Sequence, residues 1–378
     1  MSELISSRPA NFRWQLLATV SALTLMTAIN AQANADDDPR PNVWLEFGGL
    51  LDHVGEQPDP FLPDFTAIGV DHGLTGPGEL QKAPRHAIGG EAAISVQPAG
   101  ISWDFSVALR YGRSNANRHS HQQHTVPPAY LPSTVVHLQG KNHNQTVAQT
   151  ADYGVRARES HTIVDFDAGK DVGIGMRNNP AHIAFGVRFA QFTESSNTKL
   201  LGNPDPHFGY KYFPAYHLNV PFYRYYQSYK ASAEANRSFQ GLGPSLAFTG
   251  SLPMAGEDLQ RGQLAFDWGV NASLLFGRQK AHIHHQTTGR AYKGSFLGSG
   301  PPVSHYTNVT NPDRSRSVVV PNIGALAGLS VNFSNAKVSL GYRADFFFGA
   351  MDMGIDTRDT SNVVFHGPYA SVSIGLGG

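Results

Sequence analysis

The chain of 378 residues contains no cysteine, which excludes disulfide bonds and thiolate metal sites. Charged residues make up only 15% of the chain, and 29 basic residues balance 29 acidic ones. This balance gives no reason to expect nucleic acid as a partner. Beyond residue 35 no apolar run approaches the roughly 18 residues of a membrane-spanning helix, so a helical span is not expected.

The N-terminal region has the pattern of an export signal. Two arginines precede an uncharged, mostly apolar run at 14–29, and the small-residue stretch AQANA follows at 31–35. This order of a basic, an apolar and a small-residue segment is typical of secretory signal peptides. We therefore predict a cleaved signal peptide over 1–35 and a single domain over 36–378.

Alternation with a period of two is the main pattern of the remaining chain. In KVSLGYRADFFFGAMD (337–352), one set of alternate positions is apolar or aromatic, and the other set carries Ser, Gly, Arg and Asp. Successive side chains of a β-strand point to opposite faces, so this pattern predicts a strand with one apolar face. The same pattern occurs in ISWDFSVALRY (101–111), HIAFGVRFA (182–190) and AFDWGVNASLLFG (265–277).

Connections between these segments alternate in length. Short connections are expected at 97–100, 173–181, 253–261 and 334–335, and long ones at 53–85, 114–156, 195–228, 281–314 and 351–362. Short periplasmic turns and long extracellular loops are the plan of a bacterial outer-membrane barrel. A soluble sandwich has no reason to separate its loops by length in this way.

We therefore predict an all-β fold, a transmembrane antiparallel up-and-down β-barrel. Its ten expected strands are 42–52, 86–96, 101–113, 157–172, 182–194, 229–252, 262–280, 315–333, 336–350 and 363–377. Twelve strands remain the alternative, because Gly241 to Pro244 could divide the segment 229–252 and a long loop could hold a further strand.

Polarity decides which face of these strands meets lipid. With the apolar face inward, Phe and Trp would overfill a ten-stranded barrel, whereas with that face outward they meet the membrane. Outer-membrane lipid and lipopolysaccharide are therefore expected partners. The polar face would line a pore through which small hydrophilic solutes pass, and its predicted charged residues are Glu91, Asp104, Arg110, Asp165, Arg188, Asp267, Arg343 and Asp345.

Tyrosines gather in FGYKYFPAYHLNVPFYRYYQSYK (208–230). Amphipathic rings favour the level of the lipid headgroups, so we predict an aromatic girdle or rim. Its residues would be Tyr111, Tyr223, Tyr225, Tyr226 and Tyr229. A loop folded into the pore mouth and a sugar-binding platform are the alternatives.

Two histidine-rich motifs, HSHQQH (119–124) and HIHH (282–285), suggest a metal site, but no nearby acidic residue completes either one. We expect polar loops and no metal there. Signatures of hydrolases and nucleotide-binding enzymes are missing, and the spacing of Ser160, His161 and His182 supports no rim enzyme. The sequence therefore predicts no enzymatic activity and no cofactor.

The closing run NAKVSLGYRADFFFGAMD…TRDTSNVVFHGPYASVSIGLGG resembles the end of pore-forming outer-membrane proteins related to the Legionella major outer membrane protein. The resemblance is clearest over 318–378. It implies a pore in the Gram-negative outer membrane and brings no catalytic residues. Large members of this family are linked by disulfides, and this chain, lacking cysteine, departs from them.

The resulting functional prediction is a small passive pore for hydrophilic solutes in the outer membrane. The alternative is a surface adhesin or structural barrel whose loops 114–156 and 281–314 bind a partner. Whether the chain forms a homo-oligomer is left open by its sequence.

Overall fold

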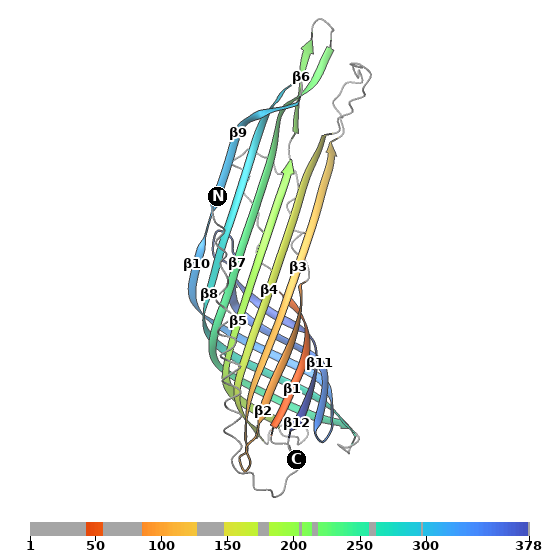
Figure 1. Ribbon diagram of the computed structural model, residues 1–378, viewed down its shortest axis with the longest axis vertical. Coiled ribbons are helices and arrows are strands. Elements are labelled where there is room, and N and C mark those ends of the chain that lie inside the picture. Colours follow the sequence, from red (N-terminus) through yellow and green to blue (C-terminus); the bar gives the residue numbers. More distant parts are fainter. Residues whose placement is uncertain are drawn as a thin grey trace, which may run out of the picture. The chain divides into compact units, whose positions relative to one another are not determined.

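The computed structural model describes residues 43–55, 85–126, 147–172, 181–203, 206–213, 218–256, 262–295 and 298–376, and every regular element in these ranges is a β-strand (Figure 1). The strands are β1 (Val43–Gly55), β2 (Arg85–Val96), β3 (Trp103–Val126), β4 (Val147–Val172), β5 (Ala181–Asn203), β6 (Pro206–Phe213), β7 (Leu218–Ala255), β8 (Gln263–Ser295), β9 (Gly298–Thr310), β10 (Asp313–Asn332), β11 (Ala336–Asp352) and β12 (Thr360–Leu376). Within the described ranges there is no helix that could span a membrane.

Antiparallel pairing closes the sheet into a ring. The order is β7-β5-β4-β3-β2-β1-β12-β11-β10-β8, and the pairing of β7 with β8 completes the circle. β9 directly precedes β10 in the chain and pairs with the same edge of β8, and β6 pairs only with the beginning of β7. The barrel therefore has ten strands, which confirms the predicted fold. The continuous strand β7 shows no break at Pro244.

Neighbouring residues on each strand face opposite sides of the wall. In β11, Phe346 is 42% exposed whereas Phe347 is completely buried. Val338, Leu340 and Tyr342 share the outer face with Phe346, while Arg343 and Asp345 point inward. The alternation read from the sequence therefore corresponds to an apolar outer face and a polar inner face in this part of the barrel.

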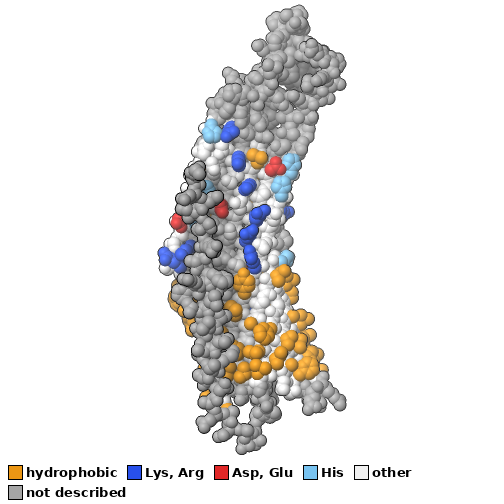
Figure 2. Space-filling view, in the orientation of Figure 1, with side chains coloured by type: hydrophobic (Ala, Val, Ile, Leu, Met, Phe, Trp, Pro, Cys, Tyr) orange, Lys and Arg blue, Asp and Glu red, His pale blue; other side chains and the backbone are white. Residues whose placement is uncertain are grey.

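The exposed apolar side chains form a band around the lower part of the barrel (Figure 2). Members of this band include Phe105, Leu109, Phe166, Phe185, Val187, Leu246, Val270, Leu274, Phe276, Ile323, Leu329, Leu340 and Val372. Because every backbone group in a closed sheet has a strand partner, such a band can meet hydrocarbon without leaving unpaired N–H or C=O groups. We call it the apolar band.

Six strands continue well beyond the apolar band. Figure 1 shows β3, β4, β5, β7, β8 and β9 extending past the level at which β1, β2, β11 and β12 end. β7 has 38 residues and β8 has 33. At ~3.3 Å per residue these strands are roughly 110–125 Å long, whereas about 9–11 residues suffice to span a membrane. We call the part beyond the apolar band the extension.

The extension corrects the predicted loop boundaries. The segment 114–156 was expected to be a loop, but β3 runs to Val126 and β4 begins at Val147, in register throughout. Parts of the expected loops 195–228 and 281–314 are also strand. Outside the membrane the outer face is polar, so the apolar alternation that marks a lipid-facing strand is lost there.

Short turns close the opposite rim. Between β2 and β3, the Ile101 amide donates to the Pro98 carbonyl at 3.3 Å, and Gly100 has a positive φ of 75° that favours glycine. Between β10 and β11, the Phe333 amide donates to the Ala336 carbonyl at 2.7 Å. The predicted short connections at 97–100 and 334–335 are therefore turns, and 173–180 lies outside the described residues.

Candidate functional site

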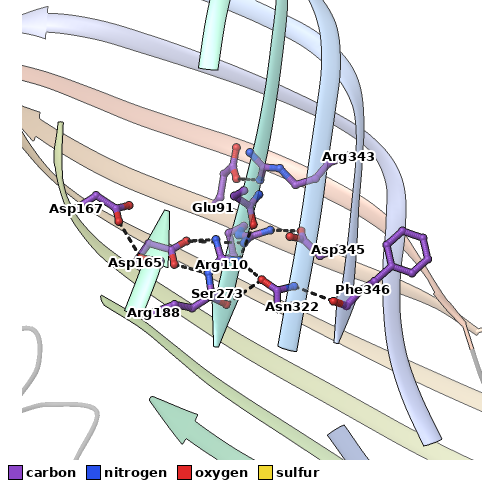
Figure 3. A network of polar contacts seen from close by, with 12 residues as sticks. Glu91, Arg110, Asp165, Asp167, Arg188, Ser273, Asn322, Arg343, Asp345 and Phe346 are labelled. Carbon is purple, nitrogen blue, oxygen red and sulfur yellow. Dashed lines mark hydrogen bonds and ion pairs between the residues drawn. The ribbon is translucent and has the colours of Figure 1, made fainter. Parts of the chain in front are cut away.

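The interior of the barrel at the level of the apolar band holds a network of buried charges (Figure 3). Arg110 on β3 donates to the carboxylate of Asp345 on β11 at 2.6 Å. Arg188 on β5 contacts both carboxylate oxygens of Asp165 on β4, with N–O distances of 2.6 and 3.1 Å. A second guanidinium nitrogen of Arg110 lies 3.8 Å from Asp165, so the two pairs are joined.

Uncharged side chains extend the network to the opposite wall. Arg188 donates to the side-chain oxygens of Asn271 on β8 and Asn322 on β10. Asn322 in turn accepts from Ser273 at 3.1 Å and donates to the Phe346 carbonyl at 3.0 Å. β5 and β10 are not neighbours in the ring, and neither are β3 and β11. The network therefore crosses the lumen, and we call it the polar layer.

Glu91 and Arg343 lie beside this network and form an ion pair from β2 to β11 (Figure 3). The Arg343 guanidinium also lies 5.3 Å from the ring centre of Tyr369, a cation–π contact. With this pair, the polar layer holds three arginines, Arg110, Arg188 and Arg343, against three carboxylates, Glu91, Asp165 and Asp345. These six residues balance in charge, and two further acidic residues, Asp52 and Asp167, lie beside them.

The remaining two predicted pore-lining residues lie nearer the short-turn rim. Asp267 pairs with Lys337 at 2.7 Å, and Asp104 lies 3.5 Å from His182. All eight side chains are on the inner side of the wall, and six of them meet in the polar layer. The sequence placed them on the inner face, but it did not indicate that they contact one another across the lumen.

An aromatic layer follows the polar layer on the side of the extension. Phe192 on β5 lies 4.7 Å from Phe347 on β11 and 5.4 Å from Phe365 on β12, measured between ring centres. Phe239 on β7 stacks on Phe192 at 5.7 Å. These rings are at most 4% exposed and pack with Ile163, Leu275 and Val320. Apolar side chains therefore fill the lumen at this level.

A third obstruction is the connection between β11 and β12. Residues 353–359, here called the inserted segment, turn inward, and Arg314 donates to the carbonyls of Gly354 and Ile355 at 2.8 Å. Asp356 lies 2.6 Å from His285 on the inner face of β8. The Ile355 side chain packs on two apolar clusters of the inner wall of the extension. The segment is thus fixed inside the barrel by polar and apolar contacts.

A small cavity lies between the polar layer and the aromatic layer. It has a volume of about 10 Å³ and lies beside Arg110 and His161, lined also by Leu50, Asp52, Ile163, Arg343, Asp345 and Phe365. This volume corresponds to about one water molecule. His161 is 2% exposed and lies 3.7 Å from Asp52 and 3.1 Å from Glu159.

Below the polar layer the inner wall carries small and polar side chains. Ser330, Ser339, Ser371 and Ser373 face this space, and Ser373 donates to Glu46 at 3.1 Å. Within the described part of the chain, Asp267 Oδ1 and Ser330 Oγ are buried without a hydrogen-bond partner from the protein. Buried polar atoms without a partner carry a desolvation penalty unless water reaches them.

Of the five tyrosines predicted to form an aromatic rim, the structure describes the side chain of Tyr111 alone. Tyr111 is on the outer face, 46% exposed, at the upper limit of the apolar band. The side chains of Tyr223, Tyr225, Tyr226 and Tyr229 lie outside what the structure describes.

The histidines and the serine noted in the sequence lie on different faces of their strands. His119 and His121 both approach Asp152, at 3.8 and 2.7 Å, on the outer side of the extension. No group of three metal-binding side chains occurs in the ranges that the structure describes. Ser160 bonds to Thr193 at 2.6 Å, whereas His161, its neighbour in the chain, points inward. These two residues cannot act as a pair, because they lie on opposite faces of β4.

Sequence reasoning missed the aromatic layer and the inserted segment. The signal for the former was a change of phase: in β7, Ala231, Ala233, Ala235 and Phe239 are apolar at odd positions, whereas Leu242, Leu246 and Phe248 are apolar at even positions. The first set faces inward and the second outward. No local pattern marks the inserted segment, because its contacts come from β7, β8 and β10.

A closed antiparallel barrel with an apolar outer band and a polar interior defines an outer-membrane β-barrel protein. A family model described as the Legionella pneumophila major outer membrane protein precursor matches residues 116–375. This match covers well over half of the chain, and the chain therefore belongs to that family. Its location is accordingly the outer membrane. A search of curated proteins finds no match.

Solved structures of barrels resemble the chain only weakly. The translocator domain of the autotransporter NalP from Neisseria meningitidis is 9% identical, with a TM-score of 0.22 and 96% of each chain covered. The Pseudomonas putida toluene transporter TodX is 11% identical, with a TM-score of 0.24 and 91% of each chain covered. At these TM-scores the two similarities carry no information on function.

Proposed function

We propose that the protein is a narrow outer-membrane pore for small hydrophilic solutes and that it rests in a closed state. The observation that carries this proposal is the polar inner face next to the short-turn rim. Asp267 Oδ1 and Ser330 Oγ are buried in it without a protein partner in the described part of the chain, which favours a hydrated lumen. A barrel that served only as a scaffold would gain stability from an apolar core at these positions.

The nature of the obstruction also supports a pore that opens. The polar layer, the aromatic layer and the inserted segment consist of side chains and one short connection, so rotation of side chains and release of the segment would clear the lumen. Balanced charge among the six ion-paired residues of the polar layer favours weak selectivity between anions and cations. Eight strands are essentially filled by side chains, so ten leave a narrow bore and restrict passage to small solutes.

Removing the aromatic layer tests whether it closes the pore. In planar bilayers we expect the double variant Phe192→Ala/Phe239→Ala to conduct in discrete steps far more often than the unmodified protein. Phe185→Ala is the matched control, because Phe185 is 52% exposed on the lipid-facing side of the same strand, β5. A second variant, Arg314→Gln, would free the inserted segment. If both variants fold as heat-modifiable barrels and never conduct, the pore proposal is wrong.

Ion selectivity tests which charges line the open path. Arg343→Ser leaves Glu91 without its ion pair, so we expect the reversal potential in a KCl gradient to shift toward cation selectivity. Lys280→Ser removes the same charge from the exposed outer face and should leave the reversal potential unchanged. An unaltered potential in Arg343→Ser would place the conducting path elsewhere.

A second candidate is a surface interaction protein that uses the extension. It is favoured by the length of β3, β4, β7 and β8, whose exposed polar faces continue far past the apolar band. Replacing residues 127–146 by a short turn tests it, because a binding protein would lose adhesion to an immobilised extracellular matrix. A pore would keep its conductance after the same change.

We also propose that residues 1–35 direct export and are then removed, and that the protein has no enzymatic activity. N-terminal sequencing of protein from the outer membrane tests the first statement. An N-terminus before residue 36 would contradict it.

A further inference from the structure

The outer face of the extension carries basic side chains directly above the apolar band (Figure 2). On β3 the last exposed aromatic residue of the band is Tyr111, and the next outward residue is Arg113. Two residues along a strand correspond to ~7 Å. An exposed tyrosine at the edge of an apolar band marks the headgroup level, so Arg113 lies at or just above the lipid headgroups.

Strand register brings further basic residues next to Arg113. Arg113 pairs with Ser160 on β4, and Asn115 pairs with Arg158, so the two arginines are diagonal neighbours. Arg156 follows Arg158 on the same face. On β5, Asn197 pairs with Arg156 and Lys199 with Gly154, which places Lys199 diagonal to Arg156. Diagonal neighbours lie ~7–8 Å apart, within reach of one shared ligand for these long side chains.

One acidic residue, Glu234 on β7, borders this cluster: it is exposed, pairs with Asn197 and is therefore diagonal to Lys199. The outward residues between its members are Asn115, Asn117, Ser160, Ser195 and Asn197. All four basic side chains are exposed, and in the described ranges no ion pair joins Arg113, Arg156 or Arg158 to a carboxylate. Asp152, the acidic residue next along β4, is contacted by His121 at 2.7 Å. Arg113, Arg156 and Arg158 therefore lie beyond the edge of the apolar band without a carboxylate partner among the described residues, which favours an anionic ligand.

Guanidinium groups match the geometry of phosphate, to which they donate two parallel hydrogen bonds. At the headgroup level the available phosphates belong to lipids. We propose that Arg113, Arg156 and Arg158 bind the phosphate groups of an anionic lipid headgroup in the outer leaflet, with lipopolysaccharide as the lipid of matching chemistry. This site does not depend on whether the lumen conducts.

Binding of purified lipid A to the folded full-length protein in neutral detergent, measured by native mass spectrometry, tests the proposal. The variant Arg113→Gln/Arg156→Gln/Arg158→Gln should bind about 100-fold more weakly, since each basic residue near an anionic surface contributes roughly five- to sixfold in affinity. The control Lys230→Gln/Arg290→Gln/Arg316→Gln removes the same charge from exposed positions outside the cluster. It should bind nearly as tightly as the unmodified protein.

Further binding measurements identify the ligand. Lipid A without phosphate groups should bind the unmodified protein as weakly as phosphorylated lipid A binds the cluster variant. Equal loss in the cluster and control variants would show general charge attraction and overturn the proposal. Undiminished binding by the cluster variant would do the same, and so would full displacement of lipid A by millimolar inorganic phosphate, which would point to a site for free phosphate.

Discussion

The two halves of β8 share one backbone arrangement, but their outer faces differ in polarity. From Leu264 to Phe276 the outward residues are apolar, and the inward ones include Asp267, Asn271 and Ser273. From Arg278 onward the outward residues are charged or polar, whereas the inner face combines Ala281 and Ile283, both at most 1% exposed, with buried Gln279, His285 and Thr287. Both halves are paired on both sides with neighbouring strands.

This difference shows that the surrounding medium, lipid or water, determines whether the outer face of a strand is apolar. The strand geometry is the same in both halves. In lipid, apolar side chains face outward and the polar atoms are matched inside. In water, the hydrophobic effect places Ala, Ile and Leu inside, as in a soluble barrel. The change at about residue 277 therefore marks where the membrane ends on β8.

The largest loss of stability is expected when a buried charge inside the barrel is removed. Asp345→Ala removes the partner of Arg110 inside the barrel, where Asp345 is 1% exposed. Breaking a buried ion pair destabilises a protein by about 3–5 kcal/mol, because one charge is left without compensation. We expect this loss in guanidinium unfolding from lipid vesicles. Asp313→Ala, at an exposed position of the extension, is the control and should change stability by less than ~0.5 kcal/mol.

A charge placed on the outer face should distinguish the two halves of β8 directly. Val270→Arg introduces a cation in the middle of the apolar band, where Val270 is 48% exposed to lipid. Near the bilayer midplane this destabilises a barrel by about 2–4 kcal/mol. Gln286→Arg makes the same charge on the extension and should be nearly neutral. Equal effects at both positions, measured in the same vesicles, would contradict the assigned membrane boundary.

The smallest effect is expected for an exposed ion pair on the extension. His121→Ala removes the contact with Asp152, whose side chain is 40% exposed. Exposed pairs contribute at most ~1 kcal/mol, so unfolding should shift by less than ~0.5 kcal/mol. A loss of stability as large as that of Asp345→Ala would show that the His121–Asp152 contact is shielded from water, which contradicts its assignment to the exposed outer face of the extension.

The fold class and the membrane-facing side of each strand could be predicted from the sequence alone, and so could a ring of ten strands, although twelve remained the alternative. These predictions were possible because a period of two fixes which side chains share a face, and because lipid requires one of those faces to be apolar over about ten residues. Arg110 and Asp345 were both predicted to face inward for this reason. The limits of the strands were not predictable in the same way, since β3 and β4 continue where no lipid requires an apolar face.

Which inner residues contact one another could be seen only in the folded barrel. Arg110 and Asp345 are 235 residues apart in the chain, and their contact depends on the stagger and curvature of the closed barrel. The aromatic layer draws its rings from β5, β7, β11 and β12, and the inserted segment is held by Arg314 and His285 from two other strands. Such contacts follow from the global register of the sheet, which local periodicity does not contain.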